Sequence, residues 1–220
     1  MANTAAPLSE IAVANFAVGI LDDTALTSLD GPSSLSRFMA REFGYTRDEV
    51  ISLYPWSFAI TRAALAPDSA APAFGYDYSY TVPADCLRVL PVTTDGRPNS
   101  AKIEYVREGN KLLTNYGPVL YIRYLRRVTN AAEFDPLFAR ALGARLARLA
   151  ATRITGKTSY KQIAQQEWQE ALSEATHVDS MQQGYAGRVE TSQDAFYGDL
   201  SEALPGNVDV FSVRGRGLPN

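Results

Sequence analysis

Cysteine and histidine are each present only once in the 220 residues, as Cys86 and His177. A single cysteine excludes an internal disulfide framework and a zinc site built from several cysteines. A Ser-His-Asp or Cys-His arrangement would need His177 together with a remote partner. We interpret His177 as a surface or helix-end residue, and Cys86 as a structural thiol in a strand.

Several functional motifs are also missing from the chain. No apolar run is long enough to cross a membrane, and no charged-then-apolar segment resembles a secretion signal, so we expect a protein made in the cytosol. The glycines form neither GxGxxG after a strand nor GxxxxGK[ST], and no metal-ligand spacing occurs. The sequence therefore predicts no cofactor, no metal and no membrane partner.

Basic residues are slightly fewer than acidic ones, with 21 Lys and Arg against 24 Asp and Glu and a net charge of −3. This balance gives no overall signal for tight nucleic-acid binding. The RGRG segment at 214–217 could contact nucleic acid, but a soluble flexible tail is the favoured interpretation. Acid pairs such as Glu104 with Glu108 are expected in any acidic protein. We predict that the chain is not an enzyme.

The most informative stretch is 134–154, FDPLFARALGARLARLAATRI. Asp135 before Pro136 predicts a helix start, and Gly156 predicts its end. Apolar residues cover nearly the whole helix, so we expect protein on most sides of it. We interpret it as the centre of a bundle that also meets a neighbouring subunit. The bulky face carries Phe134, Phe138, Leu142, Leu146 and Leu149, and the small face carries Ala139, Ala144, Ala147 and Ala151.

Arg145 falls near the bulky face of this predicted helix. An arginine in that position needs a carboxylate or carbonyl partner, or must reach water past its aliphatic stem. We therefore expect Arg145 to make a specific contact, within the chain or with a neighbouring subunit.

Two helical stretches precede this region. Ser9 is the expected N-cap of the first, at 8–21, in which Ile11, Phe16, Ile20 and Leu21 follow helical spacing. The second, at 34–54, carries Leu35, Phe38, Met39 and Phe43 on one face. Gly44 is expected to interrupt it, and Thr46 with Glu49 has the spacing of a capping box. One kinked helix and two short helices both remain open. Pro55 should end this stretch.

A β-rich region follows, from about 57 to 127. Tyr76, Tyr78, Tyr80 and Val82 alternate with polar residues, which predicts a strand with one aromatic face. Further strands are expected at 86–92, 103–106, 111–114 and 119–125, with a hairpin turn at 108–110. About five short strands are usual for a module of this size.

The last helix is expected from a capping box at Ser159 and Gln162 to about Gln183. Its apolar residues are spaced for packing against the 134–154 helix in an antiparallel hairpin. Helical periodicity ends at Gly184. The sequence thus predicts an α+β fold, in which helices at 1–56 and a helix hairpin at 128–183 form one bundle. A mainly antiparallel β module at 57–127 is inserted between them, and 184–220 is an extended C-terminal arm.

Three segments in succession resemble a known family: YPWSFA at 54–59 followed by Arg62 and Leu65, FGYDYSYTVPADCLRV at 74–89, and FDPLF followed by AL at 134–142. They are similar to the head-to-tail adaptor family of short-tailed bacteriophages, which includes tail tubular protein A. The resemblance covers roughly 8–183. It implies a structural virion protein at the head-to-tail junction, in a ring that is usually dodecameric. Such a ring connects the portal protein to the tail nozzle, and genomic DNA passes through its centre during ejection without sequence-specific binding.

Within this interpretation, large apolar residues and arginines are the candidate contacts with other subunits, the portal or the nozzle. The apolar residues of the arm are too few for independent folding but too many for a solvated linker, so we expect them to become ordered on a partner. The candidates are Trp56, Tyr76, Tyr78, Tyr80, Arg145, Tyr185, Phe196, Tyr197, Val208, Val210, Phe211, Arg214 and Arg216.

Two other functions remain open from sequence. A tail-associated peptidoglycan-degrading enzyme would need two carboxylates across a cleft, for instance Glu104 or Glu108 with another acid. A monomeric carbohydrate-binding module would use the tyrosines at 76, 78 and 80 as a stacking surface. The adaptor is the hypothesis that we carry forward.

Overall fold

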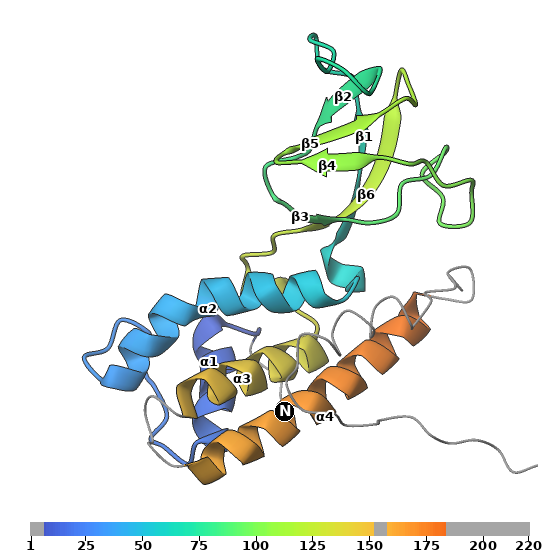
Figure 1. The fold of residues 1–220 in the computed structure, drawn as a ribbon. Coiled ribbons are helices and arrows are strands. Elements are labelled where there is room, and N and C mark those ends of the chain that lie inside the picture. The colour runs from blue at the N-terminus through green and yellow to red at the C-terminus, as the bar shows by residue number, and fades with distance from the viewer. Residues whose placement is uncertain (1–6, 152–157, 184–220) are drawn as a thin grey trace, which may run out of the picture.

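The computed structural model describes residues 7–151 and 158–183. They form a four-helix bundle with a β module standing on one side of it (Figure 1), so the predicted α+β class is confirmed. Among the residues described, no helix is both long and apolar enough to span a membrane. The helices are α1 (Glu10–Ile20), α2 (Ser34–Leu53), α3 (Pro136–Ala150) and α4 (Thr158–Gln182).

Helix α3 is the centre of the bundle, as the sequence predicted. The Asp135 carboxylate accepts a hydrogen bond from the Leu137 N–H at 2.8 Å, and Pro136 occupies the first turn. Apart from Leu149, which is partly buried, the residues of both the bulky and the small face are buried, by α1, α2 and α4 of the same chain. The burial of α3 therefore needs no neighbouring subunit, and the expected contact of this helix with one stays a prediction.

Helices α1 and α3 come unusually close at Gly143. A Cβ atom at this position would lie 2.7 Å from the Cβ of Phe16 and 3.1 Å from the carbonyl oxygen of Val13. The contact face of α1 consists of Val13, Ala14, Ala17 and Val18, all buried, whereas Phe16 is 42% exposed. Ser9 is the N-cap, as predicted, whereas the exposure of Phe16 was not predicted, because α1 is apolar nearly all round.

Helix α2 is one continuous helix of 20 residues, with Ser33 as its N-cap. Gly44 lies inside it and does not interrupt it, and Thr46 is a buried interior residue, not a cap. Packing of its buried face against α3 outweighs the weak helix propensity of one glycine. Tyr54, before Pro55, takes an extended conformation and ends the helix as expected.

Helix α4 runs antiparallel to α3 along most of its length (Figure 1), in the hairpin predicted from sequence. Ala164, Trp168 and Ala175 are buried in the shared seam. Ser159 lies within the helix and so is not its N-cap. Gly156, the predicted end of the 134–154 helix, lies outside the described residues.

The β module contains two three-stranded antiparallel sheets in place of one larger sheet. The first has the order β1-β6-β3 and the second β2-β5-β4. A core of Tyr80, Val92, Leu112 and other apolar residues lies between them. The strands are β1 (Ile60–Leu65), β2 (Tyr78–Thr81), β3 (Cys86–Val89), β4 (Val106–Glu108), β5 (Lys111–Thr114) and β6 (Leu120–Arg126).

Two details of the β module differ from the sequence prediction. Strand β1 was not predicted, because Arg62-Ala63-Ala64 carries little β propensity. The strand expected at 103–106 begins only at Val106, and Ile103 instead packs into the module core. The predicted hairpin turn is present between β4 and β5, where Gly109 adopts a φ of 59°.

Candidate interaction surfaces

The bundle and the β module meet at a junction formed by residues 54–59 and 126–135. Its core is an aromatic cluster of Trp56, Phe58, Phe134 and Phe138. The rings of Trp56 and Phe138 are 5.1 Å apart and those of Phe58 and Phe138 are 4.8 Å apart, both edge to face. Phe58 also lies 6.0 Å from Phe134. Two of the three sequence segments that resemble adaptor proteins therefore pack directly on each other.

Polar contacts connect the same junction to helix ends. Buried Asp179, near the end of α4, accepts from the backbone N–H of Ser57 at 3.0 Å and from its hydroxyl. The Gln183 amide donates to the Pro55 carbonyl at 2.7 Å. On the β module side, Arg88 donates to the Ser52 carbonyl at 2.8 Å, near the C-terminal end of α2. These bonds fix the orientation of the module on the bundle.

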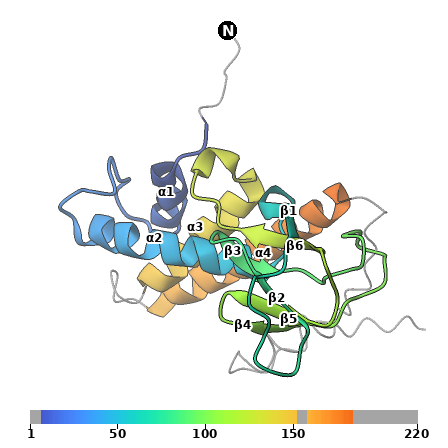
Figure 2. The same cartoon turned by 90° about the horizontal axis from the view of Figure 1, so that it is seen from above.

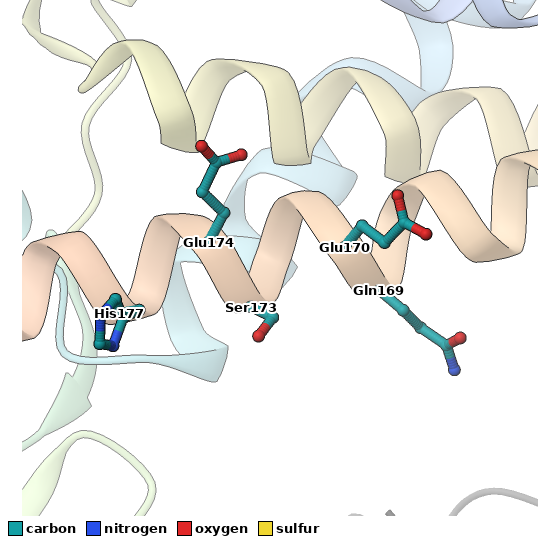
Figure 3. Close-up of a pocket in the computed structure, with 5 residues that line it drawn as sticks. All are labelled: Gln169, Glu170, Ser173, Glu174 and His177. Carbon is teal, nitrogen blue, oxygen red and sulfur yellow. The ribbon is translucent and has the colours of Figure 1, made fainter.

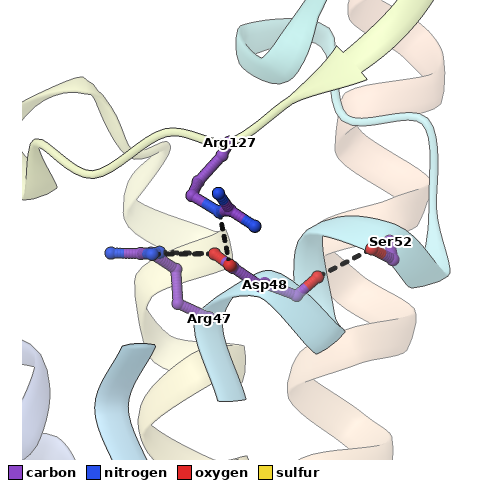
Figure 4. A network of polar contacts seen from close by, with 4 residues as sticks. All are labelled: Arg47, Asp48, Ser52 and Arg127. Atoms are coloured by element: carbon purple, nitrogen blue, oxygen red, sulfur yellow. Dashed lines mark hydrogen bonds and ion pairs between the residues drawn. The ribbon is translucent and has the colours of Figure 1, made fainter. Parts of the chain in front are cut away.

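A charged network reinforces the exit from β6 (Figure 4). Arg127, directly after the strand, donates from Nε to Asp48 Oδ2 of α2 at 2.7 Å. Arg47 pairs with the other oxygen of Asp48 at 2.8 Å, and the Ser52 hydroxyl donates to the Asp48 carbonyl. One carboxylate therefore joins two arginines from different elements.

Arg145 makes a specific contact, as expected from the sequence, and makes it within the chain. Its guanidinium forms an ion pair with Glu49 of α2 and lies over the ring of Trp168 of α4, 5.6 Å from the ring centre. Both partners belong to the same chain. Arg145 thus connects three helices of the bundle and is not left unpaired for a neighbouring subunit.

Two of the other predicted contact residues are buried within the chain, so their predicted role in contacts with partners is wrong, whereas that of Tyr78 stays a prediction. Trp56 is 1% exposed, and its indole N–H donates to the Val50 carbonyl, so it is a core residue of the junction. Tyr80 is fully buried and donates to the Tyr116 carbonyl. Tyr78 is half-buried, with its ring against Gly117. The alternation correctly placed these tyrosines on one face, but the other elements of the module cover most of that face.

Tyr76 lies before β2 and is partly exposed. It is the only tyrosine of the predicted stripe outside a strand in the described part of the chain. The remaining predicted contacts belong to the arm and lie outside the described residues: Tyr185, Phe196, Tyr197, Val208, Val210, Phe211, Arg214 and Arg216.

The residues considered for catalysis are not brought together. His177 lies on the exposed face of α4 in a shallow depression with Glu174 and Ser173 (Figure 3), and no hydrogen bond joins His177 to either side chain. Burial raises the pKa of the Cys86 thiol, which disfavours a reactive thiolate. Glu104 and Glu108 are both exposed.

Large exposed apolar side chains are the surface feature that periodicity did not reveal. Phe74, in the loop between β1 and β2, is 87% exposed, and Tyr45 on α2 is 79% exposed. Met181, on the last turn of α4, is 66% exposed. They lie on separate elements of the bundle and the module, so apolar side chains are exposed on more than one part of the molecule.

The comparisons with known proteins assign no family: no family model matches the chain, and no curated protein is significantly similar to it.

Proposed function

We propose that this chain is a subunit of a head-to-tail adaptor ring in a short-tailed bacteriophage. In this role about twelve copies bind beneath the portal, receive the tail nozzle, and leave a central channel for DNA. The protein is then a structural component of the virion tail, with itself, the portal and the nozzle as partners and with no catalytic activity.

The proposal rests on the three adaptor-like segments and on how they fold. The segments at 54–59 and 134–142 supply the aromatic cluster of the junction. The segment at 74–89 supplies Arg88, which binds the end of α2. Residues far apart in sequence thus form one structural unit, which gives a physical reason for their occurrence together. A chance match of short phrases would not require them to meet.

The surface properties also support an assembly role. A heterologous ring needs two different contact faces on each subunit, and an adaptor needs further faces for its partners. Exposed Phe74 and Tyr45 lie on different parts of the molecule, on the β module and on α2. A junction fixed by Asp179, Asp48 and Arg88 would keep such faces in a constant relative orientation.

Electron microscopy of the protein mixed with the portal protein from the same genome tests this proposal. We expect a ring of about twelve copies on one face of the portal. Without the portal, the isolated protein should sediment with the mass of a single chain. A protein that leaves the portal bare at high concentration, and that is absent from the head-to-tail junction of virions, would contradict it.

Two surface variants sharpen the experiment. Phe74→Ser and Tyr45→Ser change highly exposed side chains, so their melting temperatures should match that of the wild type. If these residues are interface anchors, at least one variant should lower ring occupancy on the portal. Phe16→Ser is not suitable as a control because Phe16 also contacts α3 at Gly143.

The two alternatives have no specific observation in their favour. Glu104 and Glu108 are both exposed, and neither lines the depression around His177 or the hollow beside Arg62 and Arg123. The tyrosine stripe is largely covered and offers no broad stacking surface for sugars. Zymography on purified cell wall remains the direct test for hydrolysis.

A further inference from the structure

Two arginines face each other across the ladder between β1 and β6. Arg62 of β1 is the direct antiparallel partner of Arg123 of β6, so both side chains project from the same face of the sheet. The strands lie side by side in the module (Figure 1). Like charges in directly opposite positions destabilise a strand pair. This arrangement therefore needs a physical explanation.

Neither guanidinium is neutralised within the part of the chain that the structure describes: no carboxylate forms an ion pair with Arg62 or Arg123 there. By contrast, Arg47, Arg126 and Arg127 each have a carboxylate partner. Arg123 is partly buried. Its burial, followed by the charge of Arg62, lowers the pKa of its guanidinium. The pair thus bears both a desolvation cost and a repulsion.

The two arginines line an open hollow of about 240 Å³ on this face. Its other walls are Ala64, Tyr121 and the Asp95-Gly96 turn. Small residues leave the space open: a Cβ at Gly96, whose φ is +75°, would lie 3.2 Å from the Cβ of Tyr121. Tyr121 is 44% exposed beside the arginines. The hollow can therefore admit a small group without any movement of the strands.

Asp95 is the one acid among the residues that line the hollow, and its carboxylate is already paired with Arg97. It accepts a hydrogen bond from the Arg97 N–H at 2.9 Å and pairs with the Arg97 side chain at 3.7 Å. A hydrogen bond from Ser100, then that from Arg97, lowers the pKa of the Asp95 carboxyl. The two guanidinium charges of Arg62 and Arg123 outnumber this single carboxylate, so the net charge of the lining is positive and favours an anion.

We propose that Arg62 and Arg123 form a binding site for a phosphate group, either free or in a nucleic-acid backbone. A carboxylate needs only one bidentate guanidinium, whereas the oxygens of a phosphate can accept from two guanidinium groups that approach from different strands. The exposed ring of Tyr121 provides an apolar surface beside the anion. This inference does not depend on the adaptor function.

The first test compares the full-length protein with Arg62→Gln and Arg123→Gln in sodium phosphate and in sodium chloride at equal ionic strength. We expect phosphate to raise the melting temperature of the wild type above its value in chloride, and to raise those of the two variants much less. Arg140→Gln, an exposed arginine of α3 with no carboxylate partner in the described residues, is the matched control and should behave as the wild type.

The second test measures binding of a fluorescent duplex oligonucleotide. A polyglutamate peptide of similar charge is measured in parallel, to represent carboxylate ligands. Binding of the duplex should weaken about tenfold in either variant and less than twofold in Arg140→Gln. A response to free phosphate alone would support the site as one for free phosphate. Equal losses in the control, tighter binding of polyglutamate, or no phosphate effect on the wild type would each overturn the proposal. If Arg123→Gln folds poorly in chloride, exposed Arg62→Gln alone decides the result.

Discussion

Ser57 and Asp179 are 122 positions apart in sequence, yet Ser57 donates to the Asp179 carboxylate from both its backbone N–H and its hydroxyl. The first residue of the 3₁₀ helix η1 (Ser57–Ala59) is thereby capped by a side chain from α4. This carboxylate is buried, with 4% of Asp179 exposed. It connects the last helix of the bundle to the point where the chain leaves for the β module.

Asp179→Ala should therefore lower the free energy of unfolding by about 1–3 kcal/mol, because it removes the buried carboxylate that accepts both hydrogen bonds from Ser57. Asp179→Asn keeps an acceptor oxygen of the same shape and should lose less. Urea denaturation measures both values. Equal stability of the alanine variant and the wild type would show that water replaces the carboxylate at no cost.

Two glycine-to-alanine substitutions should have opposite effects. Gly143→Ala places a methyl group against Phe16 and the Val13 carbonyl, so we expect a loss of about 1–3 kcal/mol. Gly44→Ala has nothing within 4 Å of the new Cβ and should stabilise α2 by about 0.5–1 kcal/mol. Thermal melts of the two variants make the comparison. A neutral Gly143→Ala would mean that α1 and α3 can separate freely.

Leu142→Ala should lower the free energy of unfolding by about 2–5 kcal/mol, and Leu146→Ala by a similar amount, because both side chains are fully buried in α3. Leu149→Ala is the control on the same helix. Leu149 is only partly buried, so its truncation should have a smaller effect. Chemical denaturation that ranks Leu149 above the other two would show that the buried faces of α3 are assigned wrongly.

Asp68 should make the β module sensitive to acid. Hydrogen bonds from Ser79 first, and then from Lys111 and Thr81, lower the pKa of its carboxyl from 3.8 to about 2, although burial opposes this shift. A lowered carboxyl pKa in the folded state stabilises the protein above the unfolded value, and this contribution is lost as the pH falls from about 4 towards 2.

Asp68→Asn removes this ionisation. Between pH 4.5 and pH 2.5, the range in which the Asp68 carboxylate of the wild type loses its stabilising effect, the melting temperature of this variant should fall less than that of the wild type. Asp77→Asn, in the same loop region, is a useful comparison because the Asp77 hydrogen bond to Asn115 comes from its backbone N–H. Parallel pH curves for wild type and Asp68→Asn would refute the role of Asp68.

The arm at 184–220 can be tested by truncation, on the proposed adaptor function. Removal of the residues after about 204 should leave the melting temperature nearly unchanged and should weaken attachment to the portal, because apolar anchors such as Phe211 would be lost. Quantitative electron microscopy of portal occupancy measures the effect. Full occupancy by the truncated protein would reduce the arm to a linker.

The sequence predicted the bundle well because its signals are local. Asp135 before Pro136 determines the start of α3, and the apolar residues of α3 and α4 have a clear helical period. The sequence also indicated that Arg145 needs a carboxylate or carbonyl partner or access to water, since a charge beside a bulky apolar face must be compensated. The identity of that partner, Glu49, was not predictable, because it depends on how α2 crosses α3.

The wrong predictions concern features that tertiary packing decides and local sequence does not. Alternation of Tyr76, Tyr78 and Tyr80 indicates which residues share a face, but not whether another sheet covers that face. Capping-box spacing at Thr46 and Glu49 was overridden by packing of a longer helix. The Arg62–Arg123 pair was invisible for a different reason, since register between β1 and β6 is set by tertiary structure.

The places where the chain enters and leaves the β module are themselves neighbours. Ile60 at the start of β1 is the direct partner of Leu125 near the end of β6. The whole module is therefore a side branch of the bundle, joined to it covalently through one strand pair, with Arg88 of β3 as a further contact to α2. Evolution could lengthen, shorten or replace such a branch without moving α2 relative to α3. The bundle and the branch are then free to diverge at different rates.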